Sequence, residues 1–329
     1  MVGLLLHLQY ATSSTVHLAC RSSNLHRPSS RLAQMKHQAH QSPSSSWASL
    51  QADVEAHLKH AMPMKEPLVV FEPMHHLSFA APATAVPALC VAACELVGGQ
   101  RHRAMPAASA LLLMLAASYT HEHLPLTDRP KPKPRPEPMI RHVYGPNIEL
   151  LTGDGIVPLA FELLARSDDP ARDDSDRVLR VIIEIARAVG SVGLVEGQYR
   201  KITTGGSGSD GGEVCHVESI RRVAEKIGGE MHACGGACGA ILGGGSEDEI
   251  ERLRKYGFYV GIIQGLLLQR GEIEKEEEEK LIMEEVEKVR DLALMELEAF
   301  EVQSMGQGPQ SKRLHIGLAL EGSQSCNYG

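Results

Sequence analysis

Apolar residues recur at helical spacing along most of the chain from residue 50 to residue 300. Leu50, Val54 and Leu58 are four residues apart, which places them on one face of a helix. Residues 273–300 also have helical spacing, with an apolar stripe on one face of the helix and strongly acidic residues on the opposite face. No segment alternates as a strand would, and no internal repeat is evident. The predicted helices cover residues 50–65, 87–96, 106–118, 148–165, 177–198, 217–242, 247–268 and 273–300.

Segments rich in proline, glycine or serine separate some of these helices. Prolines at alternate positions over residues 128–138 exclude a helix there and predict an extended loop. Residues 205–212 are almost entirely glycine and serine, which is typical of a flexible connector. We therefore expect one all-α domain over residues 51–301, followed by a disordered tail at 302–329.

The first fifty residues differ in composition from the rest of the chain. They contain no acidic residue, since the first is Asp53, and their basic residues are scattered among many serines. Such a leader is typical of an organellar transit peptide, whereas the apolar run at residues 4–6 is too short for a secretory signal. We expect residues 1–50 to be a disordered transit peptide; a disordered segment without a targeting role is the alternative.

Charge and composition narrow the classes of function. The formal net charge is −8, whereas a nucleic-acid-binding protein needs a concentrated basic surface, so we expect no nucleic-acid partner. Aromatic residues make up only 4% of the chain, which favours closely packed helices over sheets. No apolar run reaches the ~18 residues of a membrane-spanning helix. The apolar segment Ala107–Ser118 predicts a buried core helix instead.

Four of the seven cysteines form two pairs with the same spacing. Cys90 and Cys94 are four residues apart, as are Cys234 and Cys238, so each pair lies on one face of a helix. The residues between them are mostly small, which lets another helix backbone come close. Three interpretations remain open: a helix–helix or subunit contact, inert buried thiols, and metal binding or redox chemistry. We favour the first, because structural zinc sites usually have tighter cysteine spacing.

Six short motifs follow one another along the chain: Leu89–Gly99, Ala104–Ala110, His121–Asp128, Val143–Gly145, Gly193–Gln198 and Gly239–Gly244. In order and spacing they resemble plant geranylgeranyl diphosphate synthases, and the resemblance covers about residues 50–300. It implies an all-α, isoprenoid-synthase-type helical bundle around a central cavity. In that cavity, members of the family join isopentenyl diphosphate to an allylic diphosphate.

The resemblance also implies two aspartate-rich motifs that hold Mg²⁺ on the departing diphosphate, and both are altered here. Mg²⁺ requires hard oxygen ligands, whereas His123 offers an imidazole and Leu268 offers no ligand. We therefore expect no metal and no cofactor in this chain, with Mg²⁺ only in a catalytic partner. The motif positions hold Glu122, His123 and Asp128 in the first motif and Leu268, Gln269 and Glu272 in the second.

The cations that bind diphosphate in the family are missing as well. The basic segment that precedes the first cysteine pair in the family corresponds to Ala83, Thr84 and Val86. The later Lys-Thr pair of the family corresponds to Lys226 and Ile227. Each lost charge-assisted hydrogen bond to a phosphate removes about 1.5–3 kcal/mol of binding free energy. Loss of several together predicts a chain without catalytic residues of its own.

Such losses resemble one subclass of the family, the small subunits of heterodimeric geranyl or geranylgeranyl diphosphate synthases. The subclass carries two Cys-x-x-x-Cys motifs that are implicated in binding the catalytic subunit, so the resemblance assigns partner binding to the two cysteine pairs. The run His121–Asp128 is most similar to type II small subunits, which recruit or tune a plastid geranylgeranyl diphosphate synthase.

The resemblance therefore implies a non-catalytic chloroplast subunit that binds a geranylgeranyl diphosphate synthase large subunit in a heterodimer or larger assembly. The plastid stroma is the expected location, with thylakoid association through partners as a further option. The subunit would change the partner's activity, product length or location in chlorophyll and carotenoid biosynthesis. Two alternatives are kept. One is a weakly active prenyl diphosphate synthase that uses Glu122, Asp128 and Glu272 as residual metal ligands, and the other is a stand-alone zinc or redox protein built on the four cysteines.

Overall fold

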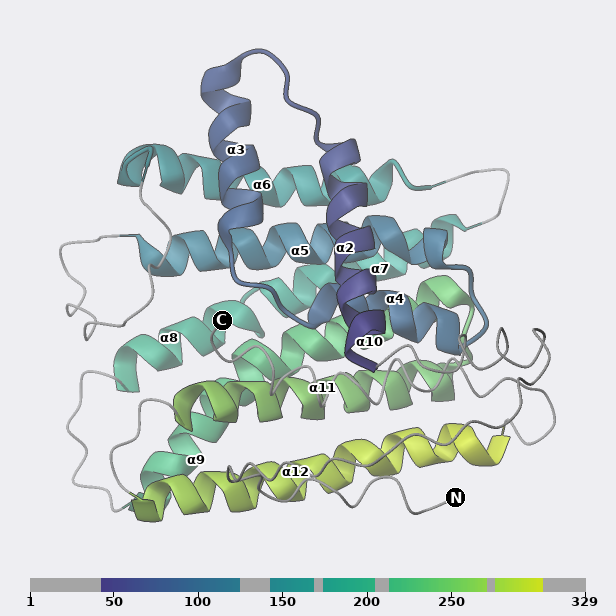
Figure 1. Cartoon of the computed structure of the whole chain (residues 1–329), viewed down its shortest axis with the longest axis vertical. Helices are drawn as coiled ribbons and strands as arrows, with labels where there is room; N and C mark the ends of the chain where they lie inside the picture. The colour runs from purple at the N-terminus through teal and green to yellow at the C-terminus, as the bar shows by residue number, and fades with distance from the viewer. Residues whose placement is uncertain (1–42, 125–142, 169–173, 205–212, 271–275, 304–329) are drawn as a thin grey trace, which may run out of the picture. The chain divides into compact units, whose positions relative to one another are not determined.

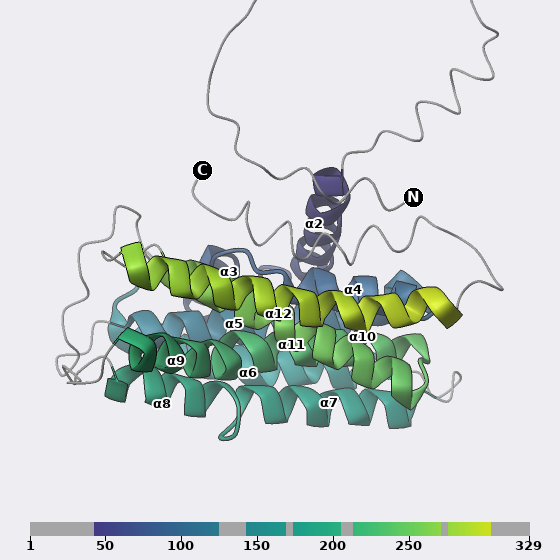
Figure 2. The ribbon, with the colours of Figure 1, turned by 90° about the horizontal axis from the view of Figure 1, so that it is seen from below.

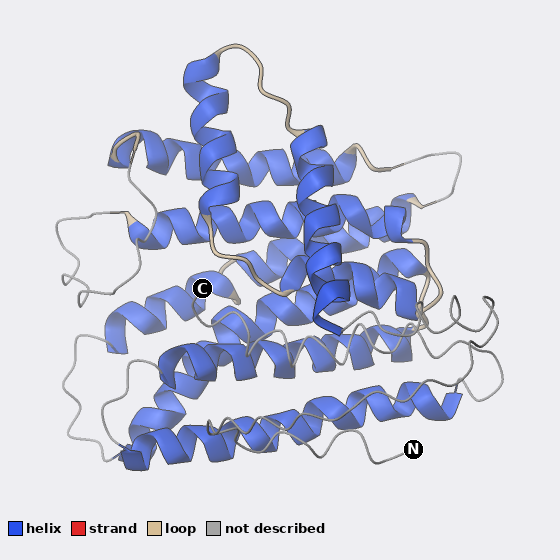
Figure 3. Ribbon diagram, viewed as in Figure 1, coloured by secondary structure: helices blue, strands red, loops and turns tan. Residues whose placement is uncertain are grey.

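Helices make up all the regular secondary structure in the part of the chain that the structure describes (Figure 3). The computed structural model describes residues 43–124, 143–168, 174–204, 213–270 and 276–303. The predicted all-α class is therefore confirmed. The helices are α2 Pro43–Ala61, α3 Leu68–Ala80, α4 Val86–Leu96, α5 Arg101–His123, α6 Pro146–Ala165, α7 Ser175–Val189, α8 Leu194–Thr204, α9 Glu213–Ala224, the π-helical turn η2 Glu225–Gly229, α10 Glu230–Gly243, α11 Glu247–Arg270 and α12 Glu276–Gln303.

Helix α10 is the centre of the core. It contacts α4, α5, α7 and α11, and every residue from Met231 to Leu242 is buried. A helix enclosed on all sides must carry small or apolar side chains all round, and the glycines, alanines and cysteines of α10 meet that need. In Figure 1, α2 and α3 cross α5 and α6, while α11 and α12 run side by side. Among the described helices, none combines the length and apolar character needed to cross a membrane.

The first described helix starts earlier than the sequence pattern predicts. Helix α2 begins at Pro43, not at Leu50, and Trp47 and Leu50 are buried at 6% and 1% exposure. Trp47 lies on the same helix face as Leu50, Val54 and Leu58, so one apolar stripe packs against the core. This helix begins inside the segment predicted as a leader, and the predicted domain boundary at residue 51 stays a prediction. The rest of the predicted transit peptide and the tail from residue 304 lie outside the described residues, and both stay predictions.

Two helix boundaries were not predicted, and one helix was missed. Helix α3 begins with three exposed apolar residues and contains Pro73, so its sequence lacks the periodic stripe on which the prediction depended. The single helix predicted over residues 177–198 is two helices, because Gly190 and Gly193 allow a tight turn between α7 and α8. A Cβ atom at Gly193 would collide with the carbonyl oxygen of Ala188. The helix predicted over residues 217–242 is likewise divided by η2.

Candidate functional site

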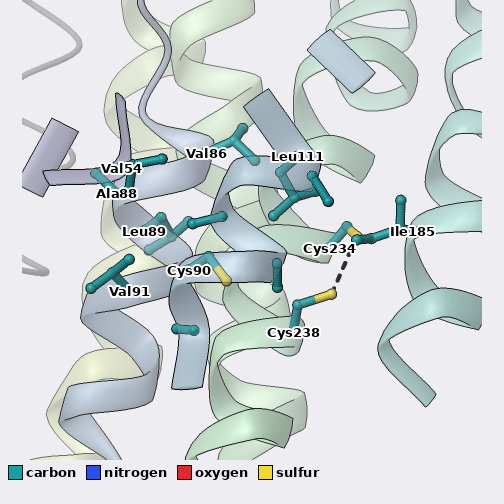
Figure 4. Packing of buried hydrophobic residues seen from close by; sticks show 14 of the residues in the cluster. Val54, Val86, Ala88, Leu89, Cys90, Val91, Leu111, Ile185, Cys234 and Cys238 are labelled. Carbon is teal, nitrogen blue, oxygen red and sulfur yellow. Dashed lines mark hydrogen bonds between the residues drawn. The ribbon is translucent and has the colours of Figure 1, made fainter. Parts of the chain in front are cut away.

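The two cysteine pairs lie on two helices that contact each other, α4 and α10. Figure 4 shows three of the four side chains, those of Cys90, Cys234 and Cys238. All four side chains are at most 2% exposed, and the Sγ atoms of Cys234 and Cys238 are 3.7 Å apart. The pairs therefore pack against each other within the chain. The family resemblance implied a partner contact at these cysteines, but in the subunit itself α4 and α10 cover the cysteine faces of each other. No sulfur of Cys90, Cys94, Cys234 or Cys238 lies on a surface that is open to another subunit.

Glycine makes this close contact possible. A Cβ atom at Gly239 of α10 would collide with the backbone carbonyl oxygen of Cys90, and one at Gly243 would lie 2.8 Å from the carbonyl oxygen of Cys94. Both obstacles are backbone atoms, which cannot turn aside as a flexible side chain can. Gly239 and Gly243, which follow the second cysteine pair, thus bring the two helix backbones together. Between the cysteines, Gly235 also approaches α4 closely, since a Cβ atom there would lie 2.9 Å from the carbonyl oxygen of Val86.

The thiols are poor candidates for redox chemistry. Burial raises the pKa of the Cys90 thiol well above its ordinary value. A hydrogen bond with Cys234, together with burial, does the same to the pKa of Cys238. Because the thiolate is the reactive form, Cys90 and Cys238 are poor nucleophiles. Among the described residues, no group of three or more His, Cys, Asp or Glu side chains is placed to hold a metal ion.

The first altered motif lies at the end of α5, where Glu122 is held by two side chains of α8. The amide Nε2 of Gln198 donates to Glu122 Oε2 at 2.9 Å, and the ammonium group of Lys201 donates to Glu122 Oε1. Burial alone would raise the pKa of Glu122, but the charge and hydrogen bond of Lys201 and the bond from Gln198 lower it below its ordinary value. Glu122 is therefore an ionised carboxylate whose charge is balanced by the ammonium group of Lys201. Asp128 of the same motif lies outside the described residues.

The neighbouring imidazole is engaged within its own helix. His123 Nδ1 donates to the carbonyl oxygen of Tyr119 at 2.8 Å, and the two rings lie against each other with centroids 4.1 Å apart. The second motif ends α11, where Leu268 is 63% exposed and Gln269 is partly buried. Glu272 lies outside the described residues. Leu268 has no ligand atom, so this position supplies nothing to a metal.

The three positions to which the family resemblance assigned missing phosphate-binding cations lie at the start of α4 and just before it. Thr84 Oγ1 accepts a hydrogen bond from the backbone N–H of Val86 at 3.1 Å, which satisfies one of the free donors at a helix start. The carbonyl oxygen of Thr84 accepts from Gln51 Nε2 at 3.3 Å. Ala83 is exposed and Val86 is buried. None of the three side chains carries a charge that could bind a diphosphate.

Comparison with known proteins identifies the family. A curated relative, the chloroplastic heterodimeric geranylgeranyl pyrophosphate synthase small subunit 2 of Cannabis sativa, is 48% identical over 283 residues, covering 85% of this chain and 94% of the relative. The chain belongs to this family of small subunits. No protein-family model matches the chain.

Solved structures agree with this membership. The geranyl diphosphate synthase small subunit from Antirrhinum majus is 48% identical, with a TM-score of 0.72 over 85% of this chain and 99% of that one. A chain of a mint deletion mutant of heterotetrameric geranyl pyrophosphate synthase is 46% identical, with a TM-score of 0.69 over 84% of this chain and 99% of that one. The resemblance noted from the sequence and the isoprenoid-synthase-type fold are therefore confirmed.

The small subunit has one surface that the sequence analysis missed, on α7 and α8. These consecutive helices lie along the side of the bundle away from α2 and α12 (Figure 2). Exposed apolar side chains on the two helices and the turn between them form what we call the α7–α8 strip. Its members, with exposed fractions of 42–69%, are Leu179, Ile183, Val192, Val195, Tyr199 and Ile202.

Helix α8 has its apolar and polar faces inverted relative to an ordinary surface helix. Val195, Tyr199 and Ile202 are spaced four and three residues apart and are exposed, whereas the polar Gln198 and Lys201 turn inward to Glu122. A surface helix of a monomeric protein normally shows the opposite arrangement. The spacing alone could have revealed a stripe in the sequence, but it would have been assigned to the core.

A pocket of about 350 Å³ lies between α2, α3, α5 and α6, on a different part of the small subunit. Met62 and Phe71 contribute to its apolar lining, and His57, Lys65 and Arg166 are among its polar residues. Its one carboxylate belongs to Glu162, which pairs with Arg166 at 2.6 Å. None of the altered motif residues lines this pocket.

Proposed function

We propose that this chain is a regulatory small subunit that binds a plastid geranylgeranyl diphosphate synthase large subunit. It would alter the activity, product length or location of that enzyme without carrying out catalysis itself. The exposed α7–α8 strip is the observation that carries this proposal. Exposed apolar patches of this kind mark interaction sites on soluble proteins, and the relatives are named as subunits of heterodimeric synthases.

The chemistry of the altered motifs supports a non-catalytic role. The departure of an allylic diphosphate needs divalent cations that bridge its oxygens. Glu122, the acid that the structure describes in the first motif, instead faces the ammonium group of Lys201. By the family resemblance, Leu268 and Thr84 occupy positions where a metal ligand and a phosphate-binding cation would be needed. Mg²⁺ chemistry is accordingly assigned to the partner.

The cysteine pairs would then support partner binding from inside the subunit. Helix α10 contacts α4 on one side and α7 on another, and Figure 4 shows Ile185 of α7 close to Cys234. Helix α7 carries Leu179 and Ile183 of the α7–α8 strip. The packing of α4 on α10 thus fixes the helix that supports part of the docking surface. A cysteine substitution would weaken the complex by disturbing this packing, not by removing a contact.

The plastid is the proposed location, since the curated relatives are named chloroplastic. The pathways served would be those of plastid isoprenoids such as chlorophyll side chains and carotenoids. Association with thylakoids would come through the partner.

A direct test mixes the full chain with a plastid geranylgeranyl diphosphate synthase large subunit and measures molar mass by size-exclusion chromatography with light scattering. We expect a complex that contains both chains in equal number, stable at micromolar concentration because heterodimer interfaces bury large apolar areas. Each protein run alone is the control. Separate elution of the two chains at these concentrations would contradict the proposal.

A further inference from the structure

Helix α8 carries half of the docking surface but is poorly anchored by apolar packing. Of the apolar side chains that the structure describes in α8, only Leu194 is buried, at 7% exposure. The backbone of Gly197 lies close to the side chain of Ile227 of η2, but Gly197 has no side chain to bury. Burial of one leucine is little for a helix of three turns, so other contacts must fix its orientation.

Polar contacts supply that anchoring from two directions. On one side, Lys226 of η2 donates to the carbonyl oxygen of Val192 at 3.1 Å and pairs with Glu196 of α8, also at 3.1 Å. On the other side, Gln198 and Lys201 both bind the carboxylate of Glu122 at the end of α5. The Glu122 and Lys201 side chains are 24% and 41% exposed, so this pair is better shielded than an ordinary surface ion pair.

We propose that Glu122, an acidic residue of the first altered motif, is a positioning residue that holds α8 so that the α7–α8 strip faces the partner. The carboxylate accepts hydrogen bonds from two residues of α8 that are three positions apart. This double attachment fixes the position of α8 along its axis and its rotation about that axis. Because Tyr199 lies between Gln198 and Lys201 in sequence, rotation of α8 would turn it away from the docking face. This role rests on the proposed pairing with a large subunit.

The test measures the Kd for the large subunit with the full chain and with Glu122→Gln and Lys201→Met variants. We expect each variant to bind about 10-fold more weakly, since each removes a charge-assisted bond that orients α8. The double variant should bind about as weakly as the weaker single variant, because both substitutions break the same pair. The matched control is Arg222→Gln, which breaks the exposed Arg222–Glu218 pair on α9 and should bind like the parent.

Hydrogen–deuterium exchange in the free chain provides a second measurement. Amides in residues 194–204 should exchange faster in the two anchor variants, Glu122→Gln and Lys201→Met, than in the parent. In Arg222→Gln their exchange rates should equal those of the parent. Parent-like binding by both anchor variants, or parent-like exchange in α8, would overturn the positioning role. If the parent chain itself fails to bind, the proposed function and the docking role both fail, while the exchange data still show whether Glu122 anchors α8.

Discussion

Replacing Tyr199 with glutamate is expected to weaken binding to the large subunit at least about 100-fold and to leave the fold of the small subunit intact. Tyr199 is 69% exposed in the free chain, so its replacement removes no core packing. In the complex the new carboxylate would be buried against an apolar surface, at a cost of about 3 kcal/mol or more. Isothermal titration calorimetry of the two purified chains measures the change directly.

Met295 provides the matched control for this prediction. It lies on α12, away from the α7–α8 strip, and is 63% exposed. Met295→Glu places the same charge on a similarly exposed apolar position and should bind with the affinity of the parent. If Tyr199→Glu binds as tightly as Met295→Glu, the strip is not the docking surface.

Replacing Gly239 with alanine is expected to destabilise the subunit by about 3 kcal/mol, although it adds a single methyl group. The added Cβ atom would collide with the carbonyl oxygen of Cys90 in the α4–α10 contact. That oxygen belongs to a buried helix backbone, so relief requires the two helices to move apart and opens gaps around the cysteine pairs. Urea unfolding followed by circular dichroism gives the free energy of unfolding of parent and variant.

Gly155 of α6 offers the same substitution in a different environment. A Cβ atom there would meet nothing within 4 Å. Gly155→Ala should therefore stabilise the subunit by about 0.5–1 kcal/mol through the better helix propensity of alanine. A Gly239→Ala variant as stable as Gly155→Ala would show that the close α4–α10 contact does not carry the stability assigned to it.

The core could be predicted from the sequence because its signals are local. The small residues around Cys90 and Cys234 already indicated close helix packing, and the periodic apolar residues located most helices. The identity of the partner helix could not be predicted in this way. A small-residue face fits a second helix of the same chain as well as it fits another subunit. The choice depends on contacts between segments far apart in sequence.

The docking surface and its anchor were beyond the sequence pattern for a related reason. Stripes such as Val195, Tyr199 and Ile202 have the spacing of a core face, and only the tertiary fold shows that none of the described helices covers them. The ion pair between Glu122 and Lys201 joins residues 79 positions apart. The motif resemblance identified Glu122 as a degraded metal ligand but gave no indication of its structural partner.

Product formation by assemblies that lack a competent large subunit tests the central claim most directly. The full chain, alone and in complex with a large subunit whose metal-binding aspartates are replaced by alanine, is incubated with Mg²⁺, radiolabelled isopentenyl diphosphate and an allylic diphosphate. We predict no prenyl product above background in either sample, while the complex with an intact large subunit is active. Product from the chain alone, or from the complex with the disabled large subunit, would contradict a non-catalytic role.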